Sequence, residues 1–302
     1  HIRGLHRPPM FSDFSLRTRV VCTLIALASL IGLIPVQTSA QAPDTTGGPA
    51  LYPDTVVTTE HTVEVDGETI RYTADTGYLP LRAEDGTVEA KMFYVAYRKE
   101  GSDRADRPVT FAFNGGPGSS SVWLHLGALG PRRVPVVSDS TDVLPPPYDL
   151  VDNEHTWLDF TDLVFIDPVT TGYSRSTQAV DEDRFHGFEG DIESVARFIR
   201  LYTTRNERWS SPKFLAGESY GTVRAAGLAS ELQDRHGMYL NGVVLVSAVL
   251  NYQANAFDTG NELVYPLFLP TYTATAHYHN ALPPETQQRD LRDLLDEVEQ
   301  WA

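Results

Sequence analysis

The sequence predicts an α/β protein with a mixed, mostly parallel sheet. Four short apolar runs have the length and composition of buried strands: residues 109–113, 162–167, 213–216 and 242–246. Helical patterns alternate with these runs, and parallel strands need such long crossover connections. This alternation predicts one parallel core with helices on both faces of the sheet.

Antiparallel strands are expected before the parallel core. Residues 61–65 and 69–72 alternate polar and apolar side chains on either side of an Asp-Gly turn at 66–67. The run 90–97 is the next strand-like segment, and it completes a meander of the kind that can edge a parallel sheet.

The helices are predicted from apolar periodicity. Residues 188–204 carry an apolar stripe, and residues 223–233 are rich in alanine and leucine. A third helix is expected over 120–129, before a Gly-Pro stop, with one face formed by Val122, Leu126 and Leu129.

Residues 217–221 read Gly-Glu-Ser-Tyr-Gly and fit the G-x-S-x-G pattern of a nucleophile elbow, between a predicted strand and a predicted helix. Such a turn is sharp, so a side chain at Gly217 or Gly221 would collide with neighbouring backbone. The pattern therefore predicts that the Ser219 hydroxyl projects at the edge of the sheet as a nucleophile.

A glycine-rich loop, residues 114–118, follows the predicted strand 109–113. In hydrolases with this elbow, such a loop supplies half of the oxyanion hole, and the residue after the nucleophile supplies the other half. The expected amides are those of Gly116 and Tyr220. A phosphate-binding loop or a plain turn is the alternative, but neither nucleotide-binding glycine pattern is present.

Three motifs together resemble the serine carboxypeptidase family in its bacterial branch: residues 114–121, Asp167-Pro168 with 172–174, and 217–221. The resemblance covers about residues 58–251. It implies an α/β-hydrolase fold, with a mixed sheet, helices on both faces, N-terminal antiparallel strands and the start of a helical cap at the C-terminal end.

The resemblance also implies a division of the chain. Residues 58–251 would form an incomplete α/β-hydrolase core, and residues 252–302 the start of the cap. Within the cap, aromatic, proline-containing loops are expected at 265–278 and a charged helix at 284–301.

The family's functional residues map onto the matching motif positions. The resemblance implies an acyl-enzyme on Ser219 and recognition of the free C-terminal carboxylate by Asn114, Gly115 and Glu218. Two carboxylates in a dry site cannot both ionise, so Glu218 is expected to keep its proton and donate to the substrate. No cofactor and no metal are implied.

Three positions depart from the family pattern. Ala112 stands where the family usually has tryptophan, and Ala128 stands where a glutamate supports the carboxylate site. These two differences leave open which substrate side chain is preferred and how part of the carboxylate-binding network is formed. Ser119 replaces a cysteine that is common in eukaryotic relatives.

Serine catalysis also needs a carboxylate and a histidine, which in this fold follow the serine in that order. Only 83 residues follow Ser219, and in the family both groups come later. The chain is therefore expected to end before its triad is complete and to be inactive alone. A substitute triad is less favoured than surface roles for the residues available: His277, His279, Asp258, Asp290, Asp293 and Asp296.

Residues 1–40 are expected to be a non-native lead followed by a signal peptide that begins at Met10. Arg17 and Arg19 precede an apolar run of 15 residues, shorter than the roughly 20 that span a bilayer, although a retained membrane anchor is the alternative. Residues 41–57 would be a linker. The protein is thus expected to be secreted or periplasmic, with no membrane contact after cleavage.

The composition limits the possible partners. The only cysteine, Cys22, lies in the leader, so disulfides and thiolate metal sites are not expected. Removing the four arginines and one aspartate of residues 1–40 changes the formal charge from −16 to −19. Nucleic acid is a poor partner for such a surface.

The sequence therefore predicts an exported serine-type carboxypeptidase that acts on peptide or protein C-termini. An acyltransferase or esterase on the same scaffold is the first alternative, because the site residues are shared. A non-catalytic binding protein is the second.

Overall fold

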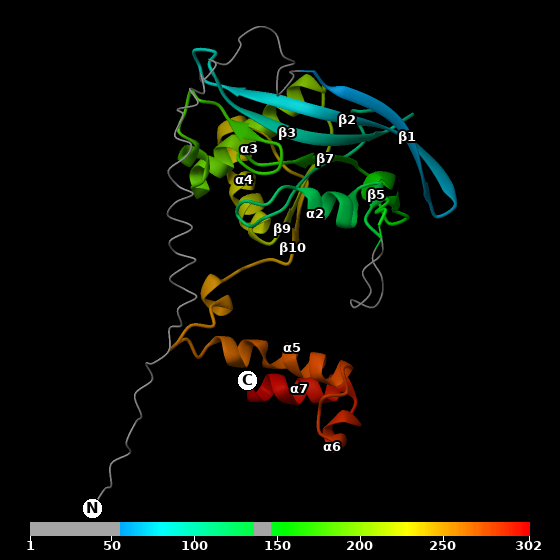
Figure 1. The fold of residues 1–302 in the computed structure, drawn as a ribbon, viewed down its shortest axis with the longest axis vertical. Coiled ribbons are helices and arrows are strands. Elements are labelled where there is room, and N and C mark those ends of the chain that lie inside the picture. Colours follow the sequence, from blue (N-terminus) through cyan, green and yellow to red (C-terminus); the bar gives the residue numbers. More distant parts are fainter. Residues whose placement is uncertain (1–54, 136–145) are drawn as a thin grey trace, which may run out of the picture. The chain divides into compact units, whose positions relative to one another are not determined.

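The fold is described from a computed structural model that covers residues 55–135 and 146–302 (Figure 1). The predicted leader and all but the last three residues of the predicted linker lie outside these ranges. In the described part, no helix is both long enough and apolar enough to cross a membrane.

One mixed sheet forms the core of the described residues. Its order is β1-β2-β3-β7-β4-β9-β10, and β8 pairs with β3. The four strands from β7 to β10 in this order run parallel, and the pairs β1–β2, β2–β3 and β3–β7 are antiparallel. The strands are β1 (Val57–Val65), β2 (Glu68–Arg82), β3 (Val88–Lys99), β4 (Val109–Phe113), β7 (Asp162–Ile166), β8 (Arg175–Ser176), β9 (Lys213–Glu218) and β10 (Gly242–Val246), with a separate pair β5 (Arg132–Arg133) and β6 (Val151–Asp152).

Helices alternate with the parallel strands, as the sequence predicts. They are α2 (Val122–Leu124), α3 (Phe188–Arg205) and α4 (Tyr220–His236). Three more helices follow β10: α5 (Val264–Tyr278), α6 (Pro284–Gln287) and α7 (Leu291–Trp301). Single 3₁₀ turns occur at Trp157–Asp159, Glu182–Phe185 and Tyr252–Asn255. The predicted start of a cap at residue 252 remains a prediction.

The sheet is covered on both faces, and β4 shows how the sequence achieves this. Phe111 and Phe113 point to one face, where they pack with the apolar stripes of α3 and α4. Ala112 points to the other face, where Leu124 and Leu158 cover it. Alternate residues of a strand point to opposite faces, so a strand that is buried on both sides must be apolar throughout.

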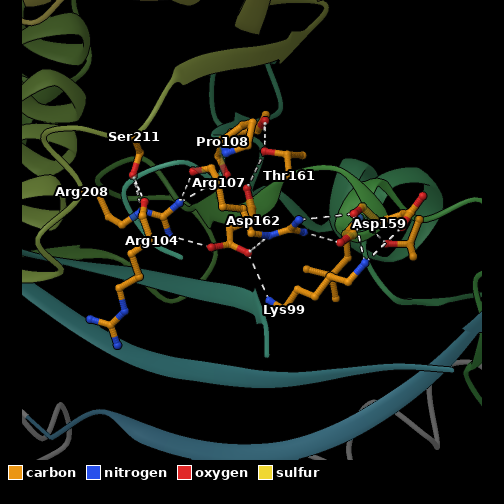
Figure 2. A network of polar contacts seen from close by, with 12 residues as sticks. Lys99, Arg104, Arg107, Pro108, Asp159, Thr161, Asp162, Arg208 and Ser211 are labelled. Carbon is orange, nitrogen blue, oxygen red and sulfur yellow. Dashed lines mark hydrogen bonds and ion pairs between the residues drawn. The ribbon is translucent and has the colours of Figure 1, made fainter. Parts of the chain in front are cut away.

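The amino ends of β4, β7 and β9 are joined by a buried charged network (Figure 2). Asp162 Oδ1 accepts hydrogen bonds from Arg107 Nε at 2.7 Å and from the backbone N–H of Lys99 at 3.1 Å. Its Oδ2 accepts from Arg208 Nη1 at 2.6 Å, and Arg208 is only 1% exposed. This network lies at the end of the sheet opposite the carboxyl ends of the parallel strands.

The helix predicted over 120–129 is different in the structure. A single α-helical turn, α2, passes directly into a wider π-type turn, His125–Leu129, which ends with Gly130 N–H bonded to the His125 carbonyl at 3.0 Å. The wider turn places residues five apart on one side. Leu124 and Leu129 are therefore buried and Leu126 is half-buried, while Val122 is exposed, so the expected apolar face is right for Leu129 and wrong for Val122.

The loops predicted at 265–278 are wrong, because this segment is helix α5. Pro266 lies in the first turn, where its missing N–H has no intrahelical partner to lose. Pro270 lies inside the helix and removes one intrahelical bond. The predicted charged helix at 284–301 is two helices, α6 and α7, and the Asp290 side chain caps the second.

Candidate active site

Ser219 occupies the turn between β9 and α4 in a strained conformation, with φ 56° and ψ −123°. A Cβ on Gly217 would lie 2.1 Å from the Gly221 carbonyl oxygen, and a Cβ on Gly221 would lie 2.9 Å from the Phe113 carbonyl oxygen. Both glycines are therefore required by close backbone approach. The elbow predicted from the sequence has the expected strand–turn–helix context.

The glycine loop and the elbow touch each other through their backbones. A Cβ on Gly115 would lie 2.4 Å from the Tyr220 backbone nitrogen and 2.7 Å from the Glu218 carbonyl oxygen. The loop can reach the elbow because β4 and β9 are adjacent parallel strands, so their carboxyl ends lie side by side. Gly116 follows in a left-handed conformation, with φ 105°.

A pocket of about 470 Å³ opens where these two segments meet. It is lined by Asn114, Gly116, Ser119, Trp123, Leu124, Glu218 and Ser219. The structure thus brings together the predicted nucleophile, one predicted oxyanion residue and two of the three predicted carboxylate-binding residues. The remaining two, Gly115 and Tyr220, adjoin the pocket through the backbone contact described above.

Asn114 is fully buried, and its amide orientation follows from its partners. Its Oδ1 accepts the backbone N–H of Leu124 at 3.0 Å, so its Nδ2 is the group that donates to Glu218 Oε2, also at 3.0 Å. The amide and the carboxyl group are therefore held together on one wall of the pocket beside Ser219. Such a pair offers both a donor and an ionisable group to a ligand.

Asp167 connects the glycine loop to the loop after β7. Its Oδ1 accepts the Ser121 backbone N–H at 2.9 Å, and its Oδ2 accepts the Tyr173 N–H at 3.2 Å. Burial raises the pKa of Asp167, and these hydrogen bonds oppose the rise. A Cβ on Gly172 would lie 1.9 Å from Asp167 Oδ2, so the Asp-Pro and Gly-Tyr-Ser motifs meet in space.

Sequence reasoning missed a buried ion pair behind the pocket. Arg224 Nε, on α4, donates to both carboxylate oxygens of Asp191 on α3, at 3.0 and 2.8 Å. Arg224 Nη1 donates to the backbone oxygen of Asn114 at 2.6 Å. Opposite charges at core-facing positions of two neighbouring helices were the available signal, because buried charges are normally paired.

Trp123 was also missed as a pocket residue. It is 71% exposed, although it lines the pocket together with Leu124. A large exposed aromatic side chain directly after a glycine-rich loop was the available signal, since such side chains are enriched in binding sites.

The histidines of the described structure do not lie among the residues that line the Ser219 pocket. His277 Nε2 lies 3.3 Å from the Arg289 carbonyl oxygen, and His279 packs edge-on against Tyr278. Within residues 55–135 and 146–302, no group of three or more His, Cys, Asp or Glu side chains could hold a metal ion.

The sequence profile of the serine carboxypeptidase family, peptidase family S10, matches residues 65–290. Pheromone-processing carboxypeptidase KEX1 of Komagataella phaffii is 35% identical over 159 residues, which cover 51% of this chain and 22% of the relative. Carboxypeptidase Y homolog A of Paracoccidioides lutzii is 28% identical over 217 residues, which cover 70% of this chain and 34% of the relative. The chain therefore spans only part of these relatives' length.

A solved structure shows the same fold. The crystal structure of KEX1(Δ)p, a prohormone-processing carboxypeptidase from Saccharomyces cerevisiae, matches 75% of this chain with a TM-score of 0.50 at 22% identity, and the match covers 52% of that chain. This likeness confirms the α/β-hydrolase class that the sequence predicts. Because the family profile covers most of the sequence, the chain belongs to the serine carboxypeptidase family.

Proposed function

We propose that the full-length protein is an exported serine-type carboxypeptidase, which releases C-terminal residues from peptides or proteins through an acyl-enzyme on Ser219. One observation carries the proposal: Ser219, in a strained turn, shares a pocket with the hydrogen-bonded pair Asn114 and Glu218. The assignment to the bacterial branch rests on the sequence pattern, and export rests on the predicted signal peptide.

The pair Asn114–Glu218 would bind the substrate's terminal carboxylate, with help from the Gly115 amide. Asn114 Nδ2 is a fixed donor, because Leu124 N–H fixes the other end of its amide. When a substrate carboxylate enters, two like charges would repel, so Glu218 binds it best with its own proton retained. This arrangement selects a free chain end.

The chemical step would be acyl transfer. Ser219 Oγ attacks the carbonyl carbon of the last peptide bond, and the amides of Gly116 and Tyr220 donate to the resulting oxyanion. The C–N bond then breaks, the departing amine takes a proton, and water hydrolyses the ester. A histidine must accept the serine proton, and the described lining of the pocket includes none, so the proposal concerns the full-length protein.

Binding of a matched ligand pair tests the proposal. Calorimetry on the chain should show that an N-blocked dipeptide acid binds about tenfold or more tightly than its C-terminal amide, because hydrogen bonds to a charged group are lost with the amide. Glu218→Leu, which cannot donate a hydrogen bond to the carboxylate, should reduce this ratio. Equal affinity of the acid and the amide for the unmodified chain would contradict the proposal.

Two other functions would use the same pocket. An acyltransferase would transfer the acyl group of an ester to an alcohol faster than it releases amino acids from dipeptides. A binding protein would not react with a fluorophosphonate probe, since this reaction needs an activated serine hydroxyl. Measuring both reactions on the full-length protein, with Ser219→Ala as the control, separates these functions from a carboxypeptidase.

A further inference from the structure

The buried pair Arg224–Asp191 connects three segments of the fold behind the pocket. Arg224 lies on α4, four residues after Tyr220, and Asp191 lies on α3. The guanidinium group lies over the rings of Phe113 and Tyr220, at 5.4 and 5.3 Å from their centroids. It therefore contacts β4, the elbow helix and, through Asp191, the helix that packs beside it.

Hydrogen bonds connect this pair directly to groups of the proposed site. Arg224 Nη1 holds the backbone oxygen of Asn114, whose side chain donates to Glu218. Tyr220, whose backbone N–H is the proposed oxyanion donor, packs its ring against the same guanidinium group. Arg224, held by Asp191, thus contacts both the carboxylate-binding residue and the residue that follows the nucleophile.

The glycine loop borders empty space on the side where this pair lies. A cavity of about 200 Å³ adjoins the pair and is also lined by Pro117 and Gly118 of the glycine loop. The loop therefore has room to shift on this side if its contact with Arg224 is removed. A displacement of about 1 Å in a positioning group can cost about 100-fold in rate.

We propose that Arg224, held by Asp191, is a positioning residue that fixes Asn114 and Tyr220 relative to Ser219. The inference rests on the proposed function, because it assigns Arg224 to the recognition of the substrate's carboxylate. Arginine suits this role because its planar group donates in fixed directions, to Asp191 on one edge and to Asn114 on another. Lysine would keep the charge but lose this geometry.

The test compares variants by the ratio of affinities for the dipeptide acid and its amide. Arg224→Gln and Asp191→Asn should each lower this ratio about tenfold, and the double variant should lower it no further, because the two residues act as one unit. Arg224→Lys should give an intermediate ratio. Arg224→Lys and Asp191→Asn also keep the inference testable if Arg224→Gln does not fold.

A matched control exists at the other end of the sheet. Arg208 is also 1% exposed and also paired with a buried aspartate, Asp162, but it lies at the amino ends of the strands (Figure 2). Arg208→Gln should lower the melting temperature as Arg224→Gln does and leave the acid-to-amide ratio unchanged. A purely structural role for Arg224 predicts the same result for both variants.

The outcomes separate the two hypotheses. If the unmodified chain prefers the acid and Arg224→Gln keeps that preference, the positioning role is wrong and the proposed function stands. If the unmodified chain shows no preference, the proposed function is wrong, and the inference falls with it. Loss of the ratio in Arg224→Gln but not in Arg208→Gln supports the positioning role.

Discussion

At the scale of single residues, His125 shows how burial changes the chemistry of a side chain. Its ring stacks on Phe165 at 4.5 Å, and its Nε2 lies 2.6 Å from the Tyr97 hydroxyl. Burial disfavours the charged form and lowers the pKa of His125 to about 4. The imidazole is therefore neutral in the folded protein at neutral pH and has a packing role.

This burial predicts a pH dependence of stability. Between about pH 6.5 and pH 4 the unfolded chain binds a proton that folded His125 does not, so stability falls as pH falls through this range. The contribution of His125 to that fall is roughly 3 kcal/mol. Urea unfolding at several pH values should show a smaller fall for His125→Gln, which cannot titrate. An unchanged slope would contradict a neutral, buried imidazole.

Residues differ in how well the sequence predicts them. Ser219, Asn114 and Glu218 could be identified because their motifs require particular neighbours at fixed spacing. Arg224 and Asp191 could be noticed only as separate charges at core-facing helix positions, because nothing in the sequence pairs a residue of one helix with a residue of another. That pairing depends on how α3 and α4 pack, which only the folded chain determines.

At the scale of elements, two backbone turns form one contact surface at the site. Gly115 packs directly on the peptide units around Tyr220, whereas Gly127, in the nearby wide turn, has open space where a Cβ would be. The packing around these two glycines therefore constrains them differently. The first is required by close approach, and the second is not.

Replacing these glycines tests the contact. Gly115→Ala should destabilise the fold by about 1–3 kcal/mol, because a Cβ at 2.4 Å from the Tyr220 nitrogen forces the turns apart. It should also reduce the acid-to-amide affinity ratio. Gly127→Ala serves as the control and should change neither quantity. Normal stability and a normal ratio in Gly115→Ala would show that the turns are not in contact.

Elements also show where sequence patterns fail. Strands β4, β7 and β9 could be predicted because apolar runs of about five residues between turn residues have few other interpretations. Helix α5 could not, because Pro266 and Pro270 suggest a loop, and the structure keeps a helix despite one lost hydrogen bond. The π-type turn at His125–Leu129 changes the apolar period, so a helical repeat could not locate its buried face.

At the scale of the whole described molecule, the two ends of the parallel strands have separate roles. The charged network around Asp162 holds the amino ends of β4, β7 and β9, whereas the pocket lies at their carboxyl ends. Rigid positioning at one end allows the other end to carry strained loops. Stability and recognition are therefore expected to respond to different substitutions.

Asp162→Ala tests this separation. The substitution leaves the buried Arg208 and the nearly buried Arg107 without their shared carboxylate, which should cost about 3–5 kcal/mol of unfolding free energy. At a temperature where the variant is still folded, its acid-to-amide ratio should match that of the unmodified chain. Measurement of both quantities by urea unfolding and calorimetry checks the prediction, and a changed ratio would show that the two ends are coupled.

The strained backbone at Ser219 affects which substitution at this position would stabilise the fold. At φ 56° a serine pays roughly 1–3 kcal/mol that a glycine would not. Screening variants for heat resistance alone would therefore favour glycine at this position and discard the hydroxyl. Any search for a more robust form of this protein must select for reactivity at the same time.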